Sequence, residues 1–169
     1  MKRENPFLFF PKQLEQGENR FEIQTDSVHI ELAGLSFTEP IRCSIILFLT
    51  GARIDMNMDI NTRIQLECSQ CGGVVDQKIE TNAEVTFLQA LERNDDEGEL
   101  KASDLEFYTE ELDLRSIVRD TLLLSVPIAP LCREDCLGLC PTCGANLNLG
   151  ACDCGSEKLQ AQQRGESNG

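Results

Sequence analysis

The chain has 169 residues, 41% of them apolar and 26% charged, which is typical of a soluble globular protein built on one main domain. Its net charge of −14 disfavours broad, sequence-independent binding to a phosphate backbone and fits a basic protein partner better. Trp is absent, Tyr occurs once, and no apolar run approaches the roughly 20 residues of a membrane span, so an extended base-stacking surface and a membrane helix are not expected.

Residues 1–20 are expected to form an N-terminal extension. They combine basic residues with the apolar run Phe7–Phe10, but Pro6 and Pro11 interrupt the stretch and no small-residue cleavage site follows. This is not the pattern of a signal peptide. We therefore expect a cytoplasmic protein in a reducing compartment, where clustered cysteines indicate metal ligands rather than disulfides.

Residues 21–130 are expected to form a β-rich domain. Short strands are predicted at Phe21–Gln24 and Ser27–Leu32, followed by a strongly apolar strand at Ile41–Leu49. From Ile54 to Ile60 apolar and polar residues alternate, which predicts a strand with one buried and one solvated face.

Cys68 and Cys71 are predicted to lie at the tip of a hairpin. Apolar strand-like residues precede them, Gly72 and Gly73 follow, and a new strand pattern begins at Val74. This is the arrangement of a zinc knuckle, in which two thiolates converge on one ion. A thioredoxin-like dithiol is the competing interpretation, but that pair belongs at a strand-to-helix junction.

The second half of the domain begins with an acidic segment. Residues 91–111 carry nine acidic and two basic side chains, and residues 92–104 are predicted to form a loop. A helix is predicted over residues 113–126, with Asp113 as its N-cap. Its apolar stripe should pack on the sheet and comprises Leu114, Ile117, Val118, Thr121 and Leu122, with Leu124 and Ser125 adding width.

Residues 131–155 form a cysteine-rich segment, and residues 156–169 are expected to be a disordered tail. With the knuckle, this segment supplies eight candidate metal ligands: Cys68, Cys71, Cys132, Cys136, Cys140, Cys143, Cys152 and Cys154. Eight thiolates suit two closed tetrahedral zinc sites of structural type, although a single ion is also compatible with the pattern. The ninth cysteine, Cys43, is interpreted as a small buried hydrophobe.

Two groupings of the eight thiols remain open. In the preferred one, Cys140, Cys143, Cys152 and Cys154 hold one ion, while Cys132 and Cys136 complete the knuckle site. The crossed grouping joins the knuckle to Cys140 and Cys143 instead. An iron–sulfur cluster is a rival to zinc, and the spacing Cys136-x3-Cys140-x2-Cys143 also matches that of radical SAM enzymes, though without the barrel that those enzymes need.

No catalytic arrangement stands out, and we expect the protein not to be an enzyme. The chain has neither a Gly-x4-Gly-Lys-Ser/Thr loop nor a Gly-x-Gly-x-x-Gly motif. Its only histidine, His29, lies in a predicted strand and is interpreted as a surface or edge residue. Taken together, the patterns predict an α+β fold: an antiparallel β-rich domain with one main helix and a C-terminal, zinc-ribbon-like cysteine segment.

Three stretches of the chain resemble the YceD family of large ribosomal RNA subunit accumulation proteins. They are the knuckle from Leu66 to Gly72, the segment from Leu112 to Ile128, and the cysteine motif from Leu131 to Asn148. The resemblance implies a non-enzymatic ribosome-biogenesis factor needed for accumulation of large-subunit (23S) rRNA.

The charge makes a basic ribosomal protein or pre-50S particle the expected partner, with no small-molecule substrate and no membrane. Any direct contact with rRNA would need a local basic patch, for which Arg115, Arg119 and Arg133 are the candidates. Two alternatives remain: a zinc-stabilised interaction module with an unrelated partner, and an iron–sulfur or dithiol redox protein.

Overall fold

The structure is a computed structural model that describes residues 5–30, 32–90 and 105–154. The chain forms two compact units: Met1–Gln65 with Gln77–Pro127, and Leu66–Asp76 with Ile128–Gly169. The second unit therefore combines the hairpin tip with the cysteine-rich segment. The predicted acidic loop at 92–104 and the predicted tail at 156–169 lie outside the described residues.

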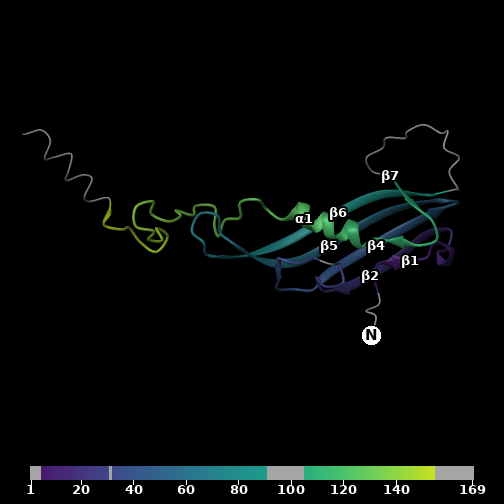
Figure 1. Cartoon of the computed structure of the whole chain (residues 1–169), viewed down its shortest axis with the longest axis horizontal. Coiled ribbons are helices and arrows are strands. Elements are labelled where there is room, and N and C mark those ends of the chain that lie inside the picture. The colour runs from purple at the N-terminus through teal and green to yellow at the C-terminus, as the bar shows by residue number, and fades with distance from the viewer. Residues whose placement is uncertain (1–4, 31, 91–104, 155–169) are drawn as a thin grey trace, which may run out of the picture. The chain divides into compact units, whose positions relative to one another are not determined.

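A mixed sheet forms the body of the first unit (Figure 1). Its strand order is β2-β4-β5-β6-β7, and β3 pairs with β5 beside this path. The strands are β2 (Gly17–Thr25), β3 (Ser36–Phe37), β4 (Ile41–Thr50), β5 (Arg53–Glu67), β6 (Val74–Gln89) and β7 (Leu105–Tyr108). β7 pairs with β6 in parallel, whereas the β2–β4, β3–β5 and β4–β5 pairs are antiparallel. The predicted α+β class is confirmed, with one parallel edge pair.

The core follows the alternation along β4 and β5. Their register places Ile45 opposite Met58 and Leu47 opposite Met56, and all four side chains are buried. Because side chains alternate between the faces of a strand, both strands turn one apolar face to the core. Cys43 belongs to this face and is fully buried, which confirms its interpretation as a core residue.

The N-terminal residues contribute to the first unit. β1 (Leu8–Phe9) pairs antiparallel with β8 (Leu112–Asp113), and a 3-10 helix at Pro11–Gln13 leads toward β2. Phe7 and Phe9 are buried. Part of the predicted extension is thus tied into the unit by apolar burial and strand pairing.

Helix α1 (Arg115–Ser125) is shorter than the predicted span of 113–126. Its N-cap is Leu114, so the assignment of that role to Asp113 is wrong. Asp113 lies in β8, where its carboxylate accepts a 3.0 Å hydrogen bond from the Arg115 backbone N–H.

Among the described residues, no helix combines the length and apolar character that crossing a membrane requires.

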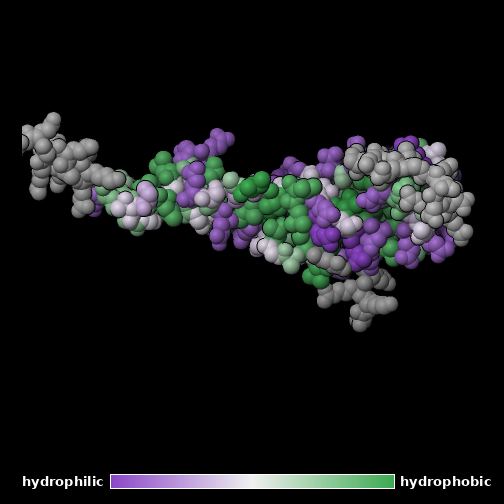
Figure 2. All heavy atoms as spheres, turned by 45° about the horizontal axis from the view of Figure 1, so that its top comes forward, coloured by the Kyte–Doolittle hydropathy of each residue, from purple (hydrophilic) through white to green (hydrophobic). Residues whose placement is uncertain are grey.

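The buried side of α1 is narrower than expected. Leu114, Val118 and Leu122 are buried, whereas Leu124 is 88% exposed. Residues two positions apart in an α-helix are separated by about 200° around the helix axis, so Leu124 cannot lie on the same side as Leu122. The predicted widening of the stripe by Leu124 is therefore wrong. Figure 2 shows hydrophobic residues on the surface of both units.

The strand predicted at Ser27–Leu32 is also wrong, because residues 27–30 form a turn. The Asp26 carboxylate accepts a 3.0 Å hydrogen bond from the Val28 N–H, and the Leu32 N–H donates to the Ser27 carbonyl at 3.0 Å. An Asp side chain that bonds the backbone two residues on competes with the hydrogen bonds of a sheet. Alternating apolar residues alone do not reveal this competition.

Candidate metal centres

The first pair of thiols lies in the turn between β5 and β6, as predicted. The Gly72 N–H donates to the Cys68 carbonyl at 2.9 Å, and the Cys68 N–H donates to the Gly73 carbonyl at 2.7 Å. Gly72 has φ +68°, a conformation that a residue without a Cβ adopts at little cost. Since strand follows strand here, the junction that a thioredoxin-like dithiol requires is absent from this turn.

The cysteine-rich segment returns to this turn within the second unit. Ser69 donates to the Pro130 carbonyl through both its backbone N–H (2.8 Å) and its hydroxyl (3.1 Å). Gly138 passes so close that a Cβ there would lie 3.2 Å from the Gln70 carbonyl oxygen, and its φ is +71°. These contacts bring Cys132 and Cys136 to the hairpin tip.

Four sulfur atoms meet as a result. The first cluster comprises Cys68, Cys71, Cys132 and Cys136, whose Sγ atoms all lie within 4.8 Å of one another. Two of the Sγ–Sγ distances, Cys68 to Cys136 and Cys71 to Cys132, are 3.7 Å. Four thiolates around one ion at a Zn–S distance of about 2.3 Å would be separated by about 3.8 Å. The spacing therefore suits one tetrahedral ion and is far too long for the roughly 2.05 Å bond of a disulfide.

The second cluster comprises Cys140, Cys143, Cys152 and Cys154, again within 4.8 Å of one another. Its first half repeats the hairpin turn: the Gly144 N–H donates to the Cys140 carbonyl at 2.9 Å, and Gly144 has φ +72°. Here the Cys140 N–H donates to the Ala145 carbonyl at 2.8 Å. The shared signal in the sequence is Cys-x2-Cys-Gly, which occurs twice.

Backbone amides prepare the first cluster for negative charge. Burial opposes ionisation of the Cys68 thiol, but backbone N–H groups, those of Cys132 and Cys71 foremost, lower its pKa to about 6. By contrast, the neighbouring Cys136 thiol raises the pKa of Cys132 to about 12. The cluster can thus ionise only in part unless a cation is bound.

The second cluster shows the same division. Hydrogen bonds from the backbone N–H groups of Cys143 and Thr142 lower the pKa of Cys140 to about 6. By contrast, the thiol of Cys143, which lies beside Cys154, raises the pKa of Cys154 to about 12. Four thiols that cannot all ionise unaided have the donor chemistry of a site for a divalent, thiophilic ion.

Asn148 supports the ligand Cys136, a role that the sequence analysis did not predict. The Asn148 amide nitrogen lies 3.4 Å from the Cys136 sulfur, and its oxygen accepts hydrogen bonds from the Leu137 N–H (2.9 Å) and from Arg133 (2.6 Å). Asn148 is therefore a positioning residue for Cys136. Its presence in the Asn146-Leu147-Asn148 end of the cysteine motif was the available signal.

The structure gathers all eight predicted ligands and groups them as in the preferred partition. The crossed grouping does not occur, and Cys136 belongs to a different cluster from Cys140 and Cys143, so the radical SAM triad is not assembled. Cys43 lies apart, where burial and the Glu22 carboxylate raise the pKa of its thiol to about 12. All nine cysteines, each within the described residues, are free of disulfides.

The arginines proposed for a basic patch are paired with carboxylates. Arg115 bonds Asp113 at 2.7 Å, and Arg119 bonds Asp120 at 3.1 Å. Arg133 lies 3.4 Å from an oxygen of Asp135. These pairs offset the positive charge that contact with a phosphate backbone would use.

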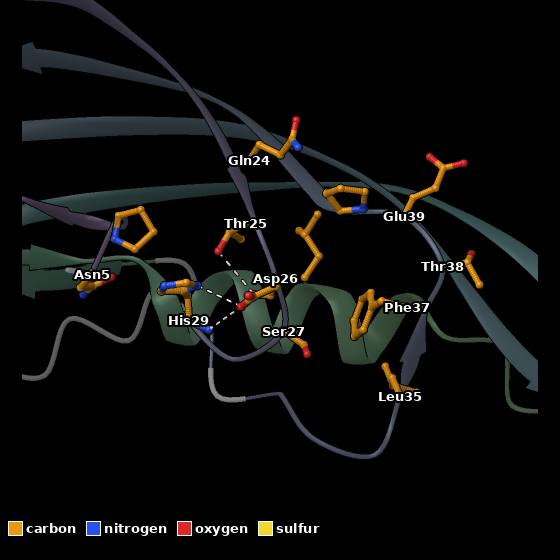
Figure 3. A pocket seen from close by; sticks show the side chains of 13 residues that line it. Asn5, Gln24, Thr25, Asp26, Ser27, His29, Leu35, Phe37, Thr38 and Glu39 are labelled. Atoms are coloured by element: carbon orange, nitrogen blue, oxygen red, sulfur yellow. Dashed lines mark hydrogen bonds and ion pairs between the residues drawn. The ribbon is translucent and has the colours of Figure 1, made fainter. Parts of the chain in front are cut away.

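A groove of about 920 Å³ lies in the first unit, between the turn after β2 and the β3 segment (Figure 3). His29 lies in this turn, and its Nδ1 is 2.9 Å from the Asp26 carboxylate. Backbone amides of the same turn also bond Asp26. This pairing serves the turn itself, and the groove brings no second histidine or thiol to His29.

Fold and site together define a class: a small α+β protein whose cysteine-rich unit is organised by two four-thiol clusters. The profile of the YceD family, described as large ribosomal RNA subunit accumulation protein YceD, matches residues 56–164. This match covers more than half of the chain, including both clusters. The chain therefore belongs to the YceD family.

The individual relatives share about a quarter to a third of their residues with this chain over the aligned part. The chain is similar to the chloroplastic large ribosomal RNA subunit accumulation protein YCED homolog 1 of Arabidopsis thaliana, at 25% identity over 70% of this chain and 45% of the relative. The Zea mays protein of the same name is 27% identical over 68% of this chain and 35% of its own length. An uncharacterized protein of Mycobacterium tuberculosis (strain ATCC 25618 / H37Rv) is 31% identical over 48% of this chain and 39% of its own length.

The chain thus spans less than half of the length of each of these relatives. No solved structure matches the chain.

Proposed function

We propose that this protein is a non-enzymatic ribosome-biogenesis factor needed for accumulation of large-subunit (23S) rRNA. Membership of the YceD family carries this proposal, and the printed names of the two plant relatives support it. The cytoplasm is the proposed site of action.

Zinc is the proposed metal, with two structural ions per chain. Each cluster supplies four protein thiols, and such a set fills the tetrahedral shell of zinc without leaving a position for water. A filled shell supplies no metal-activated hydroxide, which supports a structural and not a catalytic role. An iron–sulfur cluster of several irons would hold its four thiolates farther apart than a single ion does, so the 3.7 Å sulfur distances favour a single ion.

A basic ribosomal protein, free or on a pre-50S particle, is the proposed partner. The net charge of −14 supports this choice, and the pairing of Arg115, Arg119 and Arg133 with carboxylates speaks against contact with RNA phosphates. In this role the protein would protect or deliver a component of the large subunit.

A deletion strain tests the function. Its ratio of 23S to 16S rRNA should fall, precursors of 23S rRNA should accumulate, and a plasmid copy of the gene should restore both. A normal precursor profile would contradict the proposal and favour an interaction module with an unrelated partner. Metal analysis of the purified protein separates the remaining rival, because a zinc protein is colourless and an iron–sulfur protein is brown.

The partner is tested by affinity purification with and without nuclease, at several salt concentrations. Ribosomal proteins should remain bound after nuclease treatment. Their loss on nuclease treatment would show that RNA, and not protein, makes the contact.

A further inference from the structure

Three exposed leucines distinguish a short ribbon in the second unit. Leu137, Leu139 and Leu149 are 63%, 45% and 88% exposed. The ribbon is held together by an antiparallel bridge between Leu139 and Asn146, and by a 3.0 Å hydrogen bond from the Leu147 N–H to the Gly138 carbonyl. We call these three side chains the leucine ribbon.

Their positions follow from the backbone of the ribbon. Residues 137–139 run alongside 146–148, and a 3.1 Å hydrogen bond from the Leu149 N–H to the Asn146 carbonyl holds Leu149 close to them. Hydrophobic atoms are visible on the surface of the cysteine-rich unit in Figure 2. A single exposed leucine needs no explanation, but several gathered on a small unit indicate a contact surface.

The unit that carries the leucine ribbon is strongly acidic. Within Leu66–Asp76 and residues 128–154, five side chains are acidic and one, Arg133, is basic, a net charge of −4. Each cluster of four thiolates around a divalent ion adds a further charge of −2, because the four negative sulfurs outweigh the ion. With both ions bound, the described part of the unit has a net charge of −8.

We propose that the leucine ribbon is the docking surface for a Lys- and Arg-rich segment of a large-subunit ribosomal protein that carries apolar side chains between its basic residues. This inference rests on the function proposed above and names the surface through which it is exerted. Apolar side chains of the partner would cover the leucines, and its basic residues would face the acidic side chains and the thiolate clusters. RNA is disfavoured as the occupant because the described residues of the unit carry one basic side chain, Arg133, and it pairs with Asp135.

The test uses a defined probe: an array of overlapping 20-residue peptides that covers the large-subunit ribosomal proteins of the same organism. The full-length, zinc-loaded protein is compared with the double variant Leu137→Ser/Leu149→Ser. The matched control is Leu124→Ser, which removes a leucine from α1 that is exposed to the same 88% as Leu149. Bound zinc is measured for each protein, so that loss of the metal is recognised.

The wild type should bind peptides that combine basic and apolar residues. The double variant should bind them at least tenfold more weakly while it keeps two zinc ions per chain, and Leu124→Ser should bind as the wild type does. Equal binding by the double variant overturns the inference, as does equal weakening by Leu124→Ser. Should the double variant lose zinc, Leu137→Gln/Leu149→Gln replaces it and is judged by the same criteria.

The outcome also separates the surface from the function. If the wild type binds no peptide while the deletion strain still lacks 23S rRNA, the docking inference is wrong and the proposed function stands. If the peptides bind as expected but the deletion strain has a normal rRNA profile, the proposed function is wrong, whereas the leucine ribbon is still a binding surface for basic, apolar peptides.

Discussion

At the scale of single residues, both clusters begin from the same turn. Cys68 and Cys140 each start a Cys-x2-Cys-Gly sequence, and in each the glycine N–H bonds the carbonyl of the first cysteine at 2.9 Å. Backbone amides aimed at the first sulfur lower its pKa to about 6 in both cases. Each turn therefore presents a thiolate near neutral pH, to which an ion can bind before the remaining thiols ionise.

Single substitutions should show that the clusters are separate. Cys68→Ser and Cys140→Ser should each reduce the zinc content from two ions per chain to one, because each removes a ligand from one cluster only. Combining Cys68→Ser with Cys132→Ser should remove no more zinc than Cys68→Ser does alone. Elemental analysis of the purified proteins measures the content.

Cys43→Ala is the control for this series. Its side chain is fully buried in β4, outside both clusters, so the variant should keep two ions. If Cys68→Ser and Cys140→Ser were found to lose the same single ion, the grouping of the thiols would be contradicted.

At the scale of elements, a pair of long strands positions the first cluster. β5 and β6 are neighbours in the sheet, and the turn between them carries Cys68 and Cys71. Alternating apolar residues and the Gly72-Gly73 pair made this hairpin predictable. The return of the chain to the tip was not predictable in detail, because it depends on the contact of Ser69 with Pro130 and the close approach of Gly138 to Gln70.

Helix α1 offers a test of which of its sides is packed. Leu122 is 2% exposed, so Leu122→Ala should lower the free energy of unfolding by about 2–5 kcal/mol through lost burial and a cavity. Leu124 is 88% exposed, and Leu124→Ala should change it by no more than about 0.5 kcal/mol. Urea unfolding of the zinc-loaded protein, followed by circular dichroism, gives both values. Similar losses for the two variants would show that the helix packs differently.

At the scale of the whole molecule, the two units depend on different interactions. The first has a core of strand and helix side chains, among them Ile45, Leu47 and Met58. In the second, a buried cluster is built from Cys68, Val75 and Cys136, with Leu66 and Cys71 packed against it. A core made largely of thiols is too small to be stable alone, so metal binding must supply the stability that apolar burial does not.

Removing the metal should therefore unfold one unit and spare the other. After treatment with a strong zinc chelator, amide signals of residues 66–76 and 128–154 should lose their dispersion in a heteronuclear NMR spectrum, while those of β2 and β4 remain. A structural zinc site contributes roughly 10–16 kcal/mol of apparent binding free energy in model peptides, which is ample for this effect. Identical spectra before and after chelation, together with an absence of bound metal, would contradict the account.

Local patterns in the sequence were sufficient for the strands around Ile41–Leu49 and Ile54–Ile60, the hairpin, the main helix and the eight candidate ligands. Each of these depends on periodicity or on short spacings, which neighbouring residues specify. Tertiary structure alone decided which thiols share a cluster, that residues 27–30 form a turn, that β7 runs parallel to β6, and that Leu124 faces outward. The thiol clusters, the β6–β7 pairing and the exposure of Leu124 depend on contacts between residues far apart in the chain. At residues 27–30, the hydrogen bonds of the Asp26 turn replace those of a strand, and the alternation of apolar residues does not show which of the two will form.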